Sequence, residues 1–256
     1  MAEVTNFEHN GVSVETTESP EAMGGLGDNV VGLVGTAPKA DMSVPRSYPF
    51  RINSFTLAAL LDPTGTEAGS LYHTVHAILK VVKVPIYVVI EEEGATPADT
   101  VNAIIGGVDA TSGQVTGLGA LALCAEVPTI IGAPGFSDKQ AVHSELASLG
   151  KRIRARVVFD GLDTDVAGQV VNSQAIGGAA LGYDRCYMVH QMPAVYSKAA
   201  KANVFLPPSS LAIAAMAAVK QWESPGNQVT YAADVARTVE YNILDKSTEG
   251  DLLNRY

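Results

Sequence analysis

Short apolar runs alternate with amphipathic segments along most of this chain. Residues 29–38 form the first apolar run after a polar leader, and their β-branched side chains and closing Pro38 predict the first core strand. Residues 84–90 are continuously apolar, which is typical of a strand covered on both faces. Apolar residues recur at spacings of three and four between these runs and predict a helix over about residues 67–80.

The second half repeats this rhythm more clearly. Strands are predicted at residues 128–133, 156–160 and 185–189, and an almost wholly apolar, buried helix at residues 211–220. Shorter signals are a strand at residues 49–52, N-caps at Ser54 and Thr164, and a capping box of Ser137 with Gln140. The alternation predicts an α/β fold, with a parallel or mixed sheet and helices on both faces.

The leader, residues 1–28, has a different pattern. Val12 and Val14 alternate with polar residues up to Glu15, which predicts a short, isolated strand that needs a partner. Gly24, Gly25 and Gly27 then form a hinge. The arm strand could pair with its own body or add to the open sheet edge of a neighbouring copy.

Composition narrows the function classes. The formal net charge of −10 disfavours nucleic acid and anionic membranes as main partners, and no apolar stretch is long enough to insert in a membrane. A charged fraction of only 17% is typical of a chain whose surface is largely covered by other copies, and also of a large monomeric α/β enzyme. The one basic cluster, Lys151 to Arg156, is most simply a solvated face, and an intersubunit contact is the alternative. The two cysteines have no spacing typical of a zinc site or a disulfide framework.

Candidate chemistry is sparse. His73 and His76 share a helix face but have no third ligand set by spacing, so they are interpreted as packing residues. The glycine-rich residues 104–118 lack a phosphate-binding frame. The acidic group of Asp160, Asp163 and Asp165 lacks the glycine and the final Glu of a calcium loop. No catalytic, cofactor-binding or metal-binding residue is therefore assigned.

An α/β enzyme is the alternative function. Its active site would lie at the strand ends near Pro134, Asp160 and His190, where α/β sheets often bind ligands. His143 lies in an amphipathic helix and is a weaker candidate. A lone histidine at a strand end is a weak signal, and no strained nucleophile turn of the Gly-x-Ser-x-Gly type is present.

Several motifs, taken in order, resemble contractile tail sheath proteins of bacteriophages and R-type bacteriocins. They are Gly-Val-Ser-Val-Glu (11–15), Val-Gly-Leu-Val-Gly-Thr-Ala (31–37), Pro-Ile-Tyr-Val-Val (85–89), Thr-Gly-Leu (116–118), Ile-Gly-Ala-Pro-Gly (131–135), Pro-Pro-Ser (207–209), Trp-Glu-Ser-Pro-Gly-Asn (222–227) and Leu-Leu-Asn (252–254). The resemblance implies an extended arm over residues 1–28, a smaller peripheral α/β region over 29–100, and a non-catalytic domain of subtilisin-like topology over 101–256. It also implies a helix over residues 118–125, which the Thr-Gly-Leu motif would start.

The resemblance also implies a function. Sheath subunits stack as hexameric rings around a tail tube and contract to drive it through the host envelope. Implied partners are further copies of the chain, the tail tube protein, and the baseplate and tail terminator proteins, with no cofactor. The implied location is the virion, after assembly in the host cytoplasm, and the sheath of a related contractile injection system is the nearest alternative. Family members usually continue past the Leu-Leu-Asn motif into a further domain, whereas this sequence stops at Tyr256.

Overall fold

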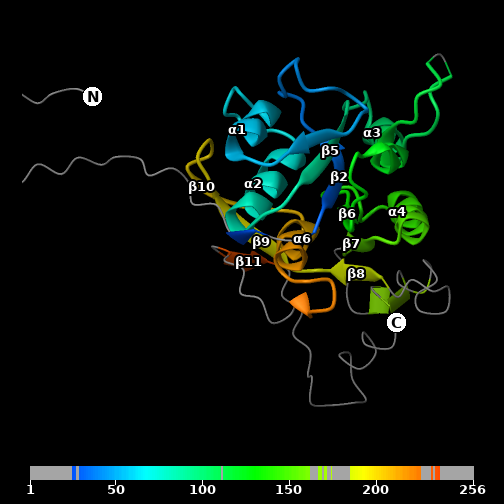
Figure 1. Ribbon diagram of the computed structural model, residues 1–256. Helices are drawn as coiled ribbons and strands as arrows, with labels where there is room; N and C mark the ends of the chain where they lie inside the picture. Colours follow the sequence, from blue (N-terminus) through cyan, green and yellow to red (C-terminus); the bar gives the residue numbers. More distant parts are fainter. Residues whose placement is uncertain are drawn as a thin grey trace, which may run out of the picture.

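The computed structural model describes residues 25–26, 29–110, 112–161, 167–168, 170–171, 174, 185–225, 232 and 234–236. Two sheets and a strand pair organise these residues (Figure 1). The strands are β1 (Gly25–Leu26), β2 (Val31–Thr36), β3 (Phe50–Ile52), β4 (Val82–Lys83), β5 (Ile86–Glu91), β6 (Ile130–Gly132), β7 (Arg156–Asp160), β8 (Cys186–Val189), β9 (Met192–Ser197), β10 (Ala202–Phe205) and β11 (Asp234–Ala236). The helices are α1 (Phe55–Ala58), η1 (Ala59–Leu61), α2 (Leu71–Val81), α3 (Pro97–Ile105), η2 (Gly117–Leu123), α4 (Gln140–Ile153) and α6 (Ser209–Ala218).

The main sheet has six strands in the order β3-β5-β2-β6-β7-β8. All neighbours are parallel except β3, which runs antiparallel to β5. The sheet is therefore mixed but mostly parallel, as the sequence predicts. Val31 of β2 is in register with Ile86 of β5 on one side and Ile130 of β6 on the other. The two regions expected on either side of residue 100 thus share one sheet, and α3 crosses that boundary.

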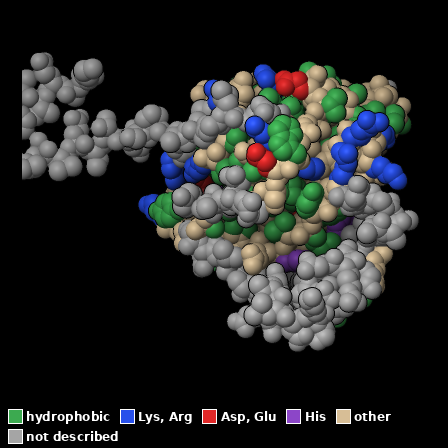
Figure 2. All heavy atoms as spheres, turned by 60° about the horizontal axis from the view of Figure 1, so that its bottom comes forward, with side chains coloured by type: hydrophobic (Ala, Val, Ile, Leu, Met, Phe, Trp, Pro, Cys, Tyr) green, Lys and Arg blue, Asp and Glu red, His purple; other side chains and the backbone are tan. Residues whose placement is uncertain are grey.

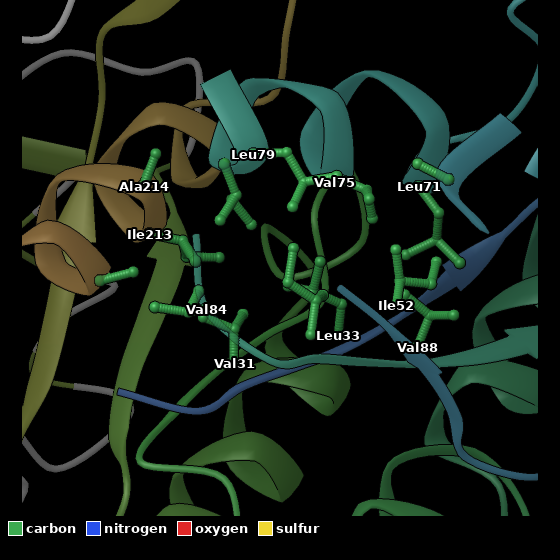
Figure 3. Packing of buried hydrophobic residues seen from close by; sticks show 14 of the residues in the cluster. Val31, Leu33, Ile52, Leu71, Val75, Leu79, Val84, Val88, Ile213 and Ala214 are labelled. Carbon is green, nitrogen blue, oxygen red and sulfur yellow. The ribbon is translucent and has the colours of Figure 1, made fainter. Parts of the chain in front are cut away.

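Helices cover both faces of this sheet. One face packs against α1, α2 and α6, and the other against α3, η2 and α4 (Figure 1). Successive residues of a strand point to opposite faces, so Leu33 joins the first core and Val34 joins the second. Figure 3 shows the first core, where Leu33 of the sheet points toward Val75 of α2. A continuous apolar strand is the consequence of burial on both faces.

A second sheet was not predicted from the sequence. Its three antiparallel strands have the order β10-β9-β11. The β9 sequence begins Met-Pro-Ala-Val-Tyr-Ser and its alternation is weak, and β11 is distant in sequence, so the pairing has no local signal. The strand β10 ends shortly before α6 begins.

Helix starts test the capping predictions. Ser54 is confirmed as an N-cap, because its Oγ accepts from the Leu57 amide at 3.3 Å. The predicted capping box of Ser137 and Gln140 is wrong: α4 begins at Gln140 after Lys139, and the buried Ser137 hydroxyl contacts Asp160 instead. Three helices also start or end away from their predicted bounds: α2 starts at Leu71, α6 spans Ser209–Ala218, and residues 117–123 form a 3₁₀ helix. Thr164 lies outside the described residues.

A true capping box was missed. Thr96 accepts from the Asp99 amide at 3.2 Å, and the Asp99 carboxylate accepts from the Thr96 amide at 3.1 Å. Pro97 then occupies the first helical position, where its missing N–H costs nothing. The local signal for α3, Thr-Pro-Ala-Asp, was therefore present in the sequence.

Candidate functional site

The carboxyl edge of the main sheet is where an α/β enzyme would place its active site. Three buried polar residues end strands there: Thr36 in β2, Glu91 in β5 and Asp160 in β7. Each of them forms hydrogen bonds at or beside the start of a helix. This edge is therefore both the candidate site and a junction between strands and helices.

Asp160 is the most completely bonded of the three. Its Oδ2 accepts from the Gly135 amide at 2.8 Å and from the Ser137 hydroxyl at 2.7 Å, and its Oδ1 accepts from the Ser209 amide at 2.8 Å. Burial raises the pKa of this carboxyl, whereas the bonds from Ser209, Ser137 and Gly135 oppose the rise. The carboxylate thus joins the end of β7 to the loop after β6 and to the first turn of α6.

Glu91 and Thr36 act in the same way on neighbouring strands. The Glu91 carboxylate accepts from the Gly117 amide at 2.7 Å, at the start of η2, and from the Ser47 hydroxyl at 2.7 Å. Burial raises the pKa of Glu91, and the bonds from Ser47 and Gly117 oppose it. The Thr36 amide donates to the Ser70 hydroxyl at 3.1 Å, just before α2. All three strand ends therefore form hydrogen bonds that fix the start of a helix.

The residues of the alternative enzyme site do lie together. Gly135, next to Pro134, donates to Asp160, and a side chain at Gly161 would overlap the imidazole of His190. Asp160, however, directs its oxygens to main-chain and serine donors, which is the arrangement of a structural cap. A general base would instead need a carboxylate oriented toward a substrate proton. Asp163 and Asp165 lie outside the described residues.

The other candidate side chains are built into packing. His143 is fully buried beside Phe159, and both of its ring nitrogens lack a hydrogen-bond partner among the described residues. His73 contacts Glu67 at 3.5 Å, and His76 stacks on Tyr72. Within the described ranges, no group of three or more His, Cys, Asp and Glu side chains could hold a metal ion. Burial raises the pKa of the Cys124 thiol to about 12, which removes its nucleophilic form at neutral pH.

The opposite, amino edge of the sheet contains a polar junction that the sequence did not reveal. Asn29 is buried just before β2, and its amide donates to the Val219 carbonyl at 2.6 Å and the Ala217 carbonyl at 3.2 Å. These carbonyls belong to the end of α6, where no intrahelical donor remains. The Asn29 Oδ1 accepts from the Arg156 guanidinium at 2.9 Å. The signal in the sequence was one asparagine before an apolar run, which does not specify such a partner.

We predict that Asn29→Ala lowers the free energy of unfolding by about 2 kcal/mol, because buried carbonyls of α6 and the Arg156 guanidinium lose their partner. Urea denaturation followed by circular dichroism measures the loss. Asn53→Ala is the matched control: Asn53 is exposed, so its removal should change stability by less than about 0.5 kcal/mol. Equal losses in both variants would contradict the assigned role of Asn29.

A basic groove lies at the same edge. It has a volume of about 400 Å³ and is lined by Val127, Pro128, Thr129, Ile153, Arg154, Arg156, Arg185, Tyr187 and Gln221. Arg154 and Arg185 are exposed, and Arg185 donates to the Arg154 carbonyl at 2.7 Å. Two of the four residues of the predicted basic cluster thus line a groove together with an arginine that is distant in sequence. Figure 2 shows a group of Lys and Arg side chains at the right of the visible face and others toward its left and top.

The predicted arm and hinge fall mostly outside the described residues. This applies to Val12, Val14, Glu15, Gly24 and Gly27. Gly25 is described: it begins β1, which pairs parallel with β4 through Gly25 and Val82. The leader is therefore attached to the body at this pair. In the part of the chain described here, no helix is long and apolar enough to cross a membrane.

Known proteins give a consistent comparison. No family model matches the chain. A prophage major tail sheath protein of Pseudomonas aeruginosa (strain UCBPP-PA14) is 29% identical over 236 residues, which cover 88% of this chain and 59% of that protein. The major tail sheath protein of Serratia phage KSP20 is 32% identical over 158 residues, or 59% of this chain and 39% of the relative. The resemblance to contractile tail sheath proteins is confirmed.

Solved sheath structures have a similar fold. The sheath complex of an extracellular contractile injection system, PVC, in its contracted state has a TM-score of 0.55 at 16% identity, covering 99% of this chain and 61% of that one. The contracted helical sheath of the anti-feeding prophage has a TM-score of 0.53 at 17% identity, covering 91% and 59%. The Pseudomonas aeruginosa match and these two structural matches each cover most of this chain but only about three fifths of the length of the other sheath protein. The relatives are structural proteins, so the comparisons favour a structural role over catalysis.

Proposed function

We propose that this chain is a structural subunit of a contractile sheath, of a phage tail or a related injection system. The observation that carries the proposal is the 236-residue match to a prophage tail sheath protein, which extends over 88% of the chain. The carboxyl edge of the sheet supports it, because Asp160 and Glu91 fasten helices there. No feature of the described residues favours an α/β enzyme over a sheath subunit.

In the proposed assembly, subunits stack as hexameric rings around a tail tube. Contraction drives the tube through the host envelope and, in a phage, leads to genome ejection. The partners are other copies of this chain, the tube protein, and the baseplate and terminator proteins. The subunit belongs to the virion after assembly in the host cytoplasm, and it needs no cofactor. The body has subtilisin-like topology without protease function, and the energy comes from repacking of a metastable lattice.

The leader is the proposed link between subunits. The arm strand around Val12, Val14 and Glu15 pairs with the sheet edge of a neighbour, where main-chain hydrogen bonds supply affinity. The β1–β4 pair supports this arrangement, because it holds the chain to its own body at Gly25 and Leu26. Gly24 and Gly27 flank that pair and give rotational freedom on both sides of it.

We predict that deleting residues 1–20 abolishes ordered assembly and leaves the body folded, because the deletion removes the arm strand but keeps β1. Negative-stain electron microscopy of the purified protein should show ordered tubes or stacked rings only when the arm is present. Circular dichroism checks that the deleted form retains its helices and strands.

A point variant separates strand pairing from the bulk effect of the deletion. Val14→Pro removes a main-chain donor and should weaken assembly, whereas Val14→Thr keeps the strand propensity and should assemble normally. If the deletion variant forms the same tubes as the intact protein, the arm has no linking role. If the protein without any deletion or substitution stays monomeric, the sheath proposal itself is contradicted.

A further inference from the structure

The two edges of the main sheet differ in charge. The amino edge contains the basic groove, in which Arg154 and Arg156 lie at the start of β7 and Arg185 precedes β8. At the carboxyl edge, Glu92 and Glu93 follow β5 directly and are exposed. Because the strands are parallel, these two groups lie at opposite ends of the same sheet. The subunit therefore has a basic end and an acidic end.

The acidic end belongs to a stretch of the sequence without basic residues. Residues 84–138 contain seven Asp and Glu residues and no Lys or Arg. Of these, Glu91 and Asp99 cap helices, and Glu126 pairs with Arg51 at 3.1 Å. Glu92 and Glu93 remain exposed on the loop between β5 and α3. In a chain with 17 basic residues, a groove with three arginines is a marked local concentration.

The composition of the groove is typical of a protein interface. Arginine, tyrosine and tryptophan contribute most of the binding energy in such interfaces. Tyr187 and Val127, which line the groove, are 39% and 61% exposed, and Trp222, next to the lining residue Gln221, is 79% exposed. Arg156 is held in place by Asn29, so one cation of the groove is preorganised. Its partner must therefore carry negative charge and some apolar surface.

We propose that the basic groove of one copy binds the acidic loop at residues 92–99 of the next copy. The loop offers Glu92 and Glu93 to Arg154 and Arg185, and its Ala95 and Pro97 are exposed apolar residues that could pack on Tyr187. The contact is heterologous, since different surfaces of the two copies meet, so it repeats in one direction instead of closing a dimer. The inference rests on the proposed self-assembly and adds a specific charged contact to it.

Charge reversal tests this contact. Arg154→Glu with Arg185→Glu makes the groove acidic, and Glu92→Lys with Glu93→Lys makes the loop basic. Each double variant alone should associate about tenfold or more weakly than the wild type, because like charges then face each other. A mixture of the two variants should recover association, since each copy then meets a complementary charge on both sides. Sedimentation velocity over a range of protein concentrations measures all four samples.

The controls keep each outcome distinct. Lys83→Glu with Lys201→Glu has the same charge change as the groove variant, and both lysines are exposed and outside the groove, so association should stay as in the wild type. Circular dichroism checks the fold of each variant. Wild-type association should also fall as NaCl rises from about 50 to about 500 mM, as expected for exposed charges.

Four results would overturn the inference. If the wild type associates and the charge-reversed variants associate equally well, the groove is not the contact, and the proposed sheath function survives. If the variants lose association and their mixture does not recover it, the loop is not the occupant. The leader is another acidic segment, with five Glu and no Lys or Arg in residues 1–24, so loss in the groove variant without loss in the loop variant would point to it as the occupant. A wild type that never associates would overturn the self-assembly proposal too.

Discussion

Replacing Asp160 by alanine should lower the free energy of unfolding by about 3 kcal/mol, among the largest losses expected for a single side chain here. The carboxylate accepts from Gly135, Ser137 and Ser209, and all three donors would be left without it in a buried site. The first turn of α6 would also lose the acceptor of its Ser209 amide, and Pro208 provides no side-chain cap in its place. Urea denaturation at neutral pH measures the change.

Asp160→Asn tests whether the number of acceptors matters. An amide keeps the shape but replaces one oxygen by a donor, which would face either Ser209 or the Gly135 and Ser137 donors. We therefore expect a loss of about 2 kcal/mol even for this close substitution. Glu93→Ala removes an exposed carboxylate and should cost less than about 0.5 kcal/mol. A stable Asp160→Asn variant that gains or loses an enzymatic activity would contradict the structural role.

The fold was largely predictable because its information is local and repeated. Burial on both faces makes β2 and β5 continuous apolar runs, and the strand-helix alternation that follows has one common solution, a parallel sheet with helices on both sides. The second sheet was not predictable in the same way. Its pairing joins β9 with β11, whose residues Met192 and Ala236 are distant in sequence, and neither strand has strong alternation.

The sites were harder to predict, for a related reason. Asp160 was correctly placed at a strand end, but its function depends on Ser137 and Ser209, which the sequence alone could not bring to it. The local spacing of Ser137 and Gln140 fits a capping box equally well, so the sequence favours that motif. Arg185 joined the basic groove only through the β7–β8 pairing. Contacts between residues that are distant in sequence therefore determine which polar residues cap helices, which form pairs and which remain exposed.

His143 should make the protein acid-sensitive. It is fully buried beside Phe159, and burial lowers its pKa to about 4 from the ordinary value of 6.5, with the charge of Asp138 acting weakly in the opposite direction. The unfolded chain binds a proton on this imidazole as pH falls through 6.5, whereas the native state stays neutral until about pH 4. The stabilisation by neutral His143 is thus complete above pH 6.5 and is lost between there and pH 4, a change of about 3 kcal/mol.

The measurement is the difference between wild type and His143→Leu, because other groups titrate in both proteins. Glu91 and Asp160 have raised pKa values and oppose the trend, and His73 adds to it, but all three cancel in the difference. Leucine removes the titration and keeps an apolar side chain against Phe159. Its stability relative to wild type should therefore rise steadily as pH falls from 7 to 4, as measured by urea denaturation at each pH. A constant difference across this range would show that the native imidazole takes up its proton as readily as the unfolded one does, and the buried, neutral state assigned to His143 would be wrong.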